Sequence, residues 1–119
     1  MESSAIKELQ QVLAKNGNGE YADQMAQYMK NNFPFYGIQS TPRRRISRQW
    51  LKNYPIANES DTCAILKLLW AKDQREFQYI GSDIAKKNKQ KLTPKSIPIL
   101  EYCIRAKSWW DTVDALAAH

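Results

Sequence analysis

The stretch SDTCAILKLLW, residues 60–70, decides the fold class of this 119-residue chain. Cys63, Leu66, Leu69 and Trp70 recur at positions i, i+3, i+6 and i+7, which places their apolar side chains on one face of a helix. Ser60 or Asp61 can begin that helix, because a hydroxyl or carboxylate oxygen accepts a hydrogen bond from a free N–H of the first turn. An alternation of period two is not sustained anywhere in the sequence, so we expect an all-α protein.

Similar amphipathic segments lie on both sides of this helix. We expect helices over residues 4–15, 20–32, 43–54 and 75–88, a sixth with Pro98 in its first turns, and a seventh from Trp109. Two segments begin with a Thr-Pro pair, at Thr41 and Thr93, where threonine serves as N-cap and proline as the first helical residue. About seven short helices with tight polar turns predict antiparallel pairs stacked as a solenoid or bundle, although no exact internal repeat is present.

Length and composition predict one soluble domain, residues 1–119. Hydrophobic residues make up 43% and charged residues 25% of the chain, as in ordinary folded proteins. No apolar run approaches the roughly 20 residues of a membrane span. The first residues, Met1-Glu-Ser-Ser-Ala-Ile-Lys-Glu8, lack the basic and apolar regions of a signal peptide. We therefore expect a cytoplasmic, bacterial protein with no membrane partner.

The residues that bind metals or cofactors are scarce. Cys63 and Cys103 both fall within apolar helical patterns, which favours buried packing over a disulfide or metal cluster. The single histidine is His119, so a histidine-based metal site is not expected. The sequence also contains no Walker-type loop, dinucleotide-binding glycine motif or nucleophile elbow. We predict no metal and no cofactor.

The net charge of +6 and the isoelectric point of about 9.4 favour a polyanionic partner, with nucleic acid first and an anionic membrane second. One basic group lies on or near residues 43–54, where a helix N-terminus and guanidinium groups can both bind phosphate. A second group lies around residues 86–95 and receives no assignment. The simpler interpretation of either group is a solvated surface. The residues are Arg43, Arg44, Arg45, Arg48 and Lys52 in the first group, and Lys86, Lys87, Lys89, Lys91 and Lys95 in the second.

The segment KSWWDTVD, residues 107–114, carries the strongest candidate for chemistry. At 100° per residue, Trp109 joins the buried face of the predicted seventh helix, and Asp111 assists the helix start. Trp110 and Asp114 are four residues apart, so they lie together at the edge of that face. A simpler alternative remains open, in which Trp110 packs and Asp114 pairs with a base such as Lys107.

Three segments together resemble the AlkD and AlkC-like DNA alkylation repair proteins. They are YMKNNFPFYGI at residues 28–38 with the following PRRR at 42–45, LWAKDQREFQY at 69–79, and KSWWDTVD at 107–114. The order and spacing agree, and the resemblance covers the chain from about Ile6 onward. It implies a curved stack of HEAT-like helix pairs whose basic concave face holds duplex DNA.

The resemblance also implies an activity, the excision of cationic N3- and N7-alkylpurines by a monofunctional DNA glycosylase. Asp114 matches the catalytic aspartate of the family, and Trp110 and Tyr28 match two aromatic residues that line the site. We expect contacts to the DNA backbone from Thr41, Arg44, Arg45 and Lys107. The partner implied is duplex DNA that contains alkylated purines.

The chain departs from the resemblance in length, because family members are roughly twice as long. We therefore expect it to be the N-terminal half of a longer HEAT-like glycosylase, with activity belonging to the full-length protein and weak or absent in the fragment. Two alternatives stay open. One is a non-catalytic DNA-binding scaffold of the same fold, and the other is a helical-repeat adaptor for proteins whose basic charge is incidental.

Overall fold

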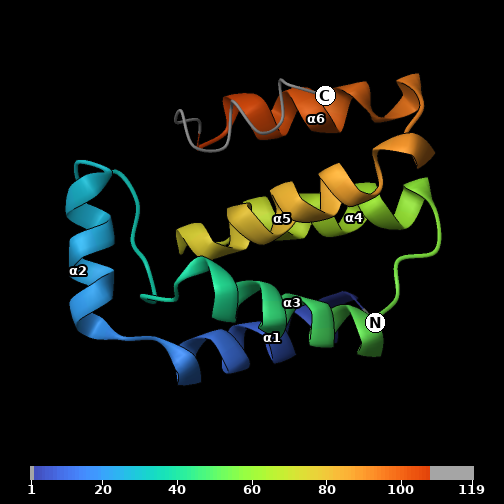
Figure 1. Ribbon diagram of the computed structural model, residues 1–119. Coiled ribbons are helices and arrows are strands. Elements are labelled where there is room, and N and C mark those ends of the chain that lie inside the picture. Colours follow the sequence, from blue (N-terminus) through green and yellow to red (C-terminus); the bar gives the residue numbers. More distant parts are fainter. Residues whose placement is uncertain (1, 108–119) are drawn as a thin grey trace. The chain divides into compact units, whose positions relative to one another are not determined.

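The computed structural model describes residues 2–107, and all regular structure in that range is helical (Figure 1). Trp110, Asp114 and the seventh helix predicted from Trp109 lie outside the described residues. The described elements are the α-helices α1 (Glu2–Asn16), α2 (Gly19–Tyr28), α3 (Ser40–Asn53), α4 (Glu59–Trp70), α5 (Arg75–Lys87) and α6 (Ile97–Arg105), and the short 3-10 helices η1 (Lys89–Lys91) and η2 (Pro94–Ser96). The predicted all-α class is confirmed over this range.

The chain divides into two compact units. In the described range, the first consists of residues 2–55 with 73–76, and the second of residues 56–72 with 77–107. The first unit holds α1, α2 and α3, together with the first two residues of α5. The second unit holds α4, the rest of α5, both 3-10 helices and α6.

In the first unit, α1 packs against α3. Ile6, Leu9 and Leu13 recur along α1 and are buried, as their spacing predicts. Trp50 of α3 is also buried, and its indole Nε1 donates a hydrogen bond to the Ala5 carbonyl at 2.8 Å. A buried indole N–H needs such an acceptor, so this bond fixes where α3 lies along α1.

In the second unit, α4 packs against α6. Leu66, Leu69 and Trp70 of α4 are completely buried, which confirms the apolar face predicted for residues 60–70. Gly81 of α5 allows a close approach, because a Cβ atom there would lie 2.4 Å from Cζ3 of the Trp70 ring. Helix α5 therefore needs glycine at this position for a reason of space, not of backbone conformation.

The two cysteines lie in the second unit and are both free thiols. Cys103 is completely buried, whereas Cys63 is only partly so and its Sγ lies 3.2 Å from the Ser96 hydroxyl. Burial raises the pKa of Cys103 to about 12, with a smaller contribution from Cys63. A thiol with that pKa is protonated at neutral pH, so Cys103 serves packing, as predicted.

The second helix is shorter than predicted. It ends at Tyr28 instead of Asn32, because Lys30 and Asn31 take positive φ angles of 54° and 59°. The Asn31 N–H donates to the Ala26 carbonyl at 2.7 Å and the Lys30 N–H to the Gln27 carbonyl at 2.9 Å. These bonds satisfy the last carbonyls of α2 in the manner of a Schellman motif. Asparagine tolerates the left-handed backbone conformation of this motif better than most residues do.

The predicted helix starts are wrong at two places. Helix α3 begins at Ser40, with the extended residue Gln39 as N-cap, so Thr41 lies inside the first turn and does not cap it. Pro42 is tolerated there because the first N–H groups of a helix have no partner within it. Helix α4 begins at Glu59, because the Asn58 side chain accepts from the Asp61 N–H at 2.9 Å.

The second Thr-Pro pair begins a different element from the one predicted. Thr93 accepts a hydrogen bond from the Lys95 N–H through its hydroxyl, but the element that it caps is the 3-10 helix η2. Helix α6 follows directly from Ile97, with Pro98 in its first turn as predicted.

Candidate nucleic-acid interface

Tyr28 is the last residue of α2 and is 71% exposed. The residue after it, Met29, is buried and anchors the end of the helix. The two left-handed residues Lys30 and Asn31 then reverse the chain. Tyr28 is thus presented to solvent by a helix end whose backbone conformation is specified locally.

The segment from Phe33 to Ile38, which follows this turn, is held by a buried carboxylate. Glu76 lies in the first turn of α5 and is completely buried. Its oxygens accept hydrogen bonds from three consecutive backbone N–H groups, those of Tyr36 at 3.0 Å, Gly37 at 3.0 Å and Ile38 at 3.2 Å. Bonds to an ionised acceptor are about twice as strong as neutral ones, so this segment is tightly specified.

Arg75, the neighbour of Glu76, holds the start of the same segment. Its guanidinium carbon lies 3.8 Å from the centroid of the Phe33 ring, and its backbone N–H donates to the Pro34 carbonyl at 2.9 Å. The pKa of Tyr36 is raised, first by burial and then by the negative charge of Glu76. We name this arrangement of Arg75 and Glu76 with residues 33–38 the Arg-Glu clamp.

Gln78 is the third polar residue of the segment Arg75-Glu76-Phe77-Gln78, and it belongs to the second unit. It is completely buried, and its Nε2 donates to the carbonyls of Leu69 and Lys72, both at 3.0 Å. The amide thereby closes the turn between α4 and α5. The motif at residues 75–78 is therefore a set of backbone anchors, and sequence reasoning identified it only as part of a resemblance.

The arginines at the start of α3 divide between the interior and the surface. Arg43 is buried, whereas Thr41, Arg44 and Arg45 are exposed. Helix α3 has no acidic residue in its first turn and no side-chain cap. Its N-terminus therefore offers unneutralised positive dipole charge beside two exposed guanidinium groups, an arrangement that suits a phosphate.

Lys107 is not exposed in the same way. It follows α6, is partly buried, has a φ angle of 53°, and its Nζ donates to the Lys72 carbonyl. Of the predicted site residues, Tyr28, Thr41, Arg44 and Arg45 belong to the first unit and Lys107 to the second. Trp110 and Asp114 lie outside the described residues, so the structure does not test their predicted pairing.

Residues 9–119 match the family model of the DNA alkylation repair enzymes. This chain belongs to the DNA alkylation repair family. The resemblance predicted from the three sequence segments is thereby confirmed. The family match includes Trp110 and Asp114 as well as Tyr28 and the α3 arginines, but it assigns no role to any of them.

A solved structure of a predicted DNA alkylation repair enzyme from Enterococcus faecalis has the same fold. It is 32% identical to this chain, with a TM-score of 0.77, and the similarity covers 86% of this chain and 48% of the Enterococcus protein. This member of the DNA alkylation repair family thus spans about half the length of that relative. The predicted all-helical, HEAT-like fold is confirmed by this similarity. No curated protein matches the chain.

Within residues 2–107, no group of three histidine, cysteine, aspartate or glutamate side chains is arranged to hold a metal ion. Nor is any helix in that range long and apolar enough to cross a membrane.

Proposed function

We propose that this chain is part of a DNA glycosylase that hydrolyses the N-glycosidic bond of cationic N3- and N7-alkylpurines in duplex DNA, and that it acts in the cytoplasm. The observation that carries the proposal is the family match over residues 9–119, which includes the segment with Trp110 and Asp114. The proposed enzyme needs no metal and no cofactor, because the positive charge of the alkylated base already makes that base a good leaving group.

The alkylated purine is positively charged and leaves as a neutral base, so no general acid is required. The deoxyribose then develops oxocarbenium-like positive charge, as in glycoside hydrolysis. An ionised Asp114 would stabilise that charge and orient the attacking water. The aromatic faces of Trp110 and Tyr28 would hold the cationic nucleotide by cation–π attraction. The exposure of Tyr28 at the end of α2 suits this role.

The N-terminal turn of α3 is the proposed contact with the DNA backbone. Thr41, Arg44 and Arg45 are exposed there, and free N–H groups of the first turn add to their positive potential. Lys107 remains a weaker member of this set, because its Nζ already donates to the Lys72 carbonyl. That bond restricts where the ammonium group can reach, although an ammonium group has three N–H donors, so this bond alone does not prevent it from binding a phosphate.

The chemistry is tested by the release of 7-methylguanine from alkylated duplex DNA. The protein should be assayed in the full length that its gene encodes, and the 119-residue chain should be assayed beside it. We expect release by the full-length protein, and a loss of at least about a hundredfold in Asp114→Asn, in line with the removal of one electrostatic stabiliser. Unchanged release in Asp114→Asn would reject the assignment.

The backbone contact is tested by the salt dependence of DNA binding. Each phosphate contact removed lowers the slope of log K against log salt by about 0.9. We expect Arg44→Gln and Arg45→Gln each to reduce the slope by about that amount, whereas Lys7→Gln, which removes an exposed cation of α1, leaves it unchanged. A weak salt dependence in the unaltered protein would instead favour a protein-interaction adaptor. DNA binding without any base release would favour a non-catalytic scaffold.

A further inference from the structure

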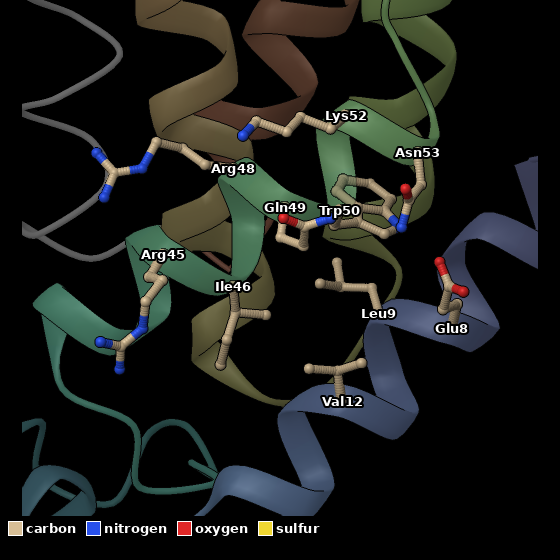
Figure 2. Close-up of a pocket in the computed structure, with 10 residues that line it drawn as sticks. All are labelled: Glu8, Leu9, Val12, Arg45, Ile46, Arg48, Gln49, Trp50, Lys52 and Asn53. Carbon is tan, nitrogen blue, oxygen red and sulfur yellow. The ribbon is translucent and has the colours of Figure 1, made fainter.

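A cavity of about 490 Å³ lies between α1 and α3, within the first unit (Figure 2). Its floor is apolar. Leu9 and Val12 contribute from α1, and Ile46 and Trp50 contribute from α3. The one polar atom of the Trp50 ring is already bonded, because Nε1 donates to the Ala5 carbonyl. The floor therefore selects for an apolar body and offers no side-chain hydrogen bond to a polar one.

The rim of this cavity is cationic. Arg45, Arg48 and Lys52 line it from α3 and are all exposed, and Figure 2 shows Arg45 and Arg48 extending outward from the helix. Against these three cations the lining includes one carboxylate, that of Glu8 on α1. Among residues 2–107, no hydrogen bond or ion pair engages any of the three cationic side chains. Their charges are thus available to a ligand.

We propose that this cavity is a binding site for a small amphiphilic anion, a compact aromatic or aliphatic body that carries one carboxylate, sulfonate or phosphate group. The volume lies within the range of about 300–1,000 Å³ typical of small-molecule sites. The body of the ligand occupies the floor, and its anionic group takes the rim. There the guanidinium groups can form bidentate bonds with it, while their aliphatic stems cover the apolar ligand. The site contains none of the proposed catalytic or base-binding residues, but it shares Arg45 with the proposed contact to the DNA backbone.

The test uses 2-naphthoate as the probe and its neutral isostere 2-naphthamide as the matched ligand, each titrated into the 119-residue chain by two-dimensional NMR. We expect saturable binding of 2-naphthoate, with the largest shifts on Val12, Ile46 and Gln49, and at least about fivefold weaker binding of 2-naphthamide. Equal affinity for the two probes would overturn the assignment of an anion site. So would the absence of saturation at millimolar 2-naphthoate, or shifts centred outside α1 and α3.

Two substitutions separate the rim from the floor. Arg48→Gln removes one rim cation and should weaken 2-naphthoate binding about two- to fivefold, as expected for an exposed ion pair, while 2-naphthamide binding is unchanged. Val12→Trp fills the floor from a half-exposed position and should abolish binding of both probes. Lys86→Gln removes an exposed cation of α5 in the second unit and should change neither. Circular dichroism confirms that each variant is folded. If Arg48→Gln and Lys86→Gln behave alike, the rim has no role and the proposal fails.

Discussion

Glu76 in the first unit and Glu59 in the second perform the same task in opposite environments. Each carboxylate lies in the first turn of a helix and accepts hydrogen bonds from a distant segment of chain. Glu76 is completely buried and binds three backbone N–H groups of residues 36–38. Glu59 lies near the surface and binds the Thr93 N–H, the Thr93 hydroxyl and the Ser96 hydroxyl.

The two carboxylates differ in whether water can take their place as hydrogen-bond acceptor when they are removed. If Glu59 is removed, solvent reaches Thr93, which is exposed, and satisfies its N–H and hydroxyl groups, while the buried Ser96 hydroxyl keeps the Cys63 Sγ at 3.2 Å as a partner. If Glu76 is removed, the N–H groups of Gly37 and Ile38 stay buried without an acceptor. An unsatisfied buried donor costs about 1–3 kcal/mol, whereas an exposed one costs little. Similar hydrogen-bond patterns therefore predict very different contributions to the free energy of unfolding, and four substitutions test that expectation.

Glu76→Ala should have the largest effect. It leaves the N–H groups of residues 36–38 without their acceptor, and we expect the free energy of unfolding to fall by about 3–5 kcal/mol. Urea unfolding followed by circular dichroism measures this loss. Glu20→Ala removes an exposed glutamate of α2 in the same unit and should change the free energy of unfolding by less than about 0.5 kcal/mol. A loss below about 1 kcal/mol in Glu76→Ala would show that solvent reaches the clamp.

Gly37→Ala should have the next largest effect, because it alters the backbone that Glu76 binds. Gly37 has a φ angle of +91°, and a Cβ atom there would lie 1.9 Å from the Asn18 carbonyl oxygen. Backbone strain and the clash together should lower the free energy of unfolding by about 2–4 kcal/mol, measured by the same urea unfolding. Gly19→Ala is the matched control, since a Cβ atom at Gly19 would have no atom within 4 Å, and it should be neutral or stabilise by up to about 1 kcal/mol. Equal effects at the two glycines would contradict the close approach.

Phe33→Leu should have a smaller effect, because it removes one contact of the clamp and leaves its hydrogen bonds. Leucine keeps an apolar contact but loses the ring that lies 3.8 Å from the Arg75 guanidinium carbon. We expect the free energy of unfolding to fall by about 1 kcal/mol, and Phe33→Tyr, which keeps the ring face, to stay within about 0.5 kcal/mol of the unaltered protein. If tyrosine and leucine cost the same, the cation–π contact is not what stabilises this position.

The sequence predicts the helices well because their determinants are local. The spacing of Leu66, Leu69 and Trp70 identifies α4, and the spacing of Ile6, Leu9 and Leu13 identifies α1. Helix ends are predicted less well, since they depend on single backbone conformations such as the positive φ angles of Lys30 and Asn31. The capping residue Asn58 is present in the sequence, but Ser60 and Asp61 are equally good candidates by residue type alone.

The candidate site shows the same division between local and distant determinants. Arg43 shares a helical face with Ser47 and Trp50, at i, i+4 and i+7, so its burial could have been predicted from the sequence. That prediction would have distinguished Arg43 from Arg44 and Arg45. The role of Glu76 could not, because its partners are 38–40 residues away and no local pattern marks them. A glutamate beside an arginine in a first turn ordinarily indicates a solvated helix start.

Glu59→Gln should have the smallest effect, and its pH dependence distinguishes it from the others. The pKa of Glu59 is lowered below its ordinary value of 4.5, first by the Ser96 hydroxyl and then by the Thr93 N–H and hydroxyl, with Lys95 contributing less. A carboxylate whose pKa is lowered on folding stabilises the protein above its unfolded-state pKa, and this stabilisation is lost as the pH falls through the folded-state pKa. Glutamine does not titrate. The difference in melting temperature between the unaltered protein and Glu59→Gln should therefore be small at neutral pH, shrink as the pH falls below 4.5, and vanish once the pH is below the folded-state pKa. Glu101→Gln, which removes an exposed carboxylate of α6, controls for the change in net charge. A difference that persists unchanged in strong acid would mean that Glu59 stabilises the second unit by packing and not as an ionised acceptor.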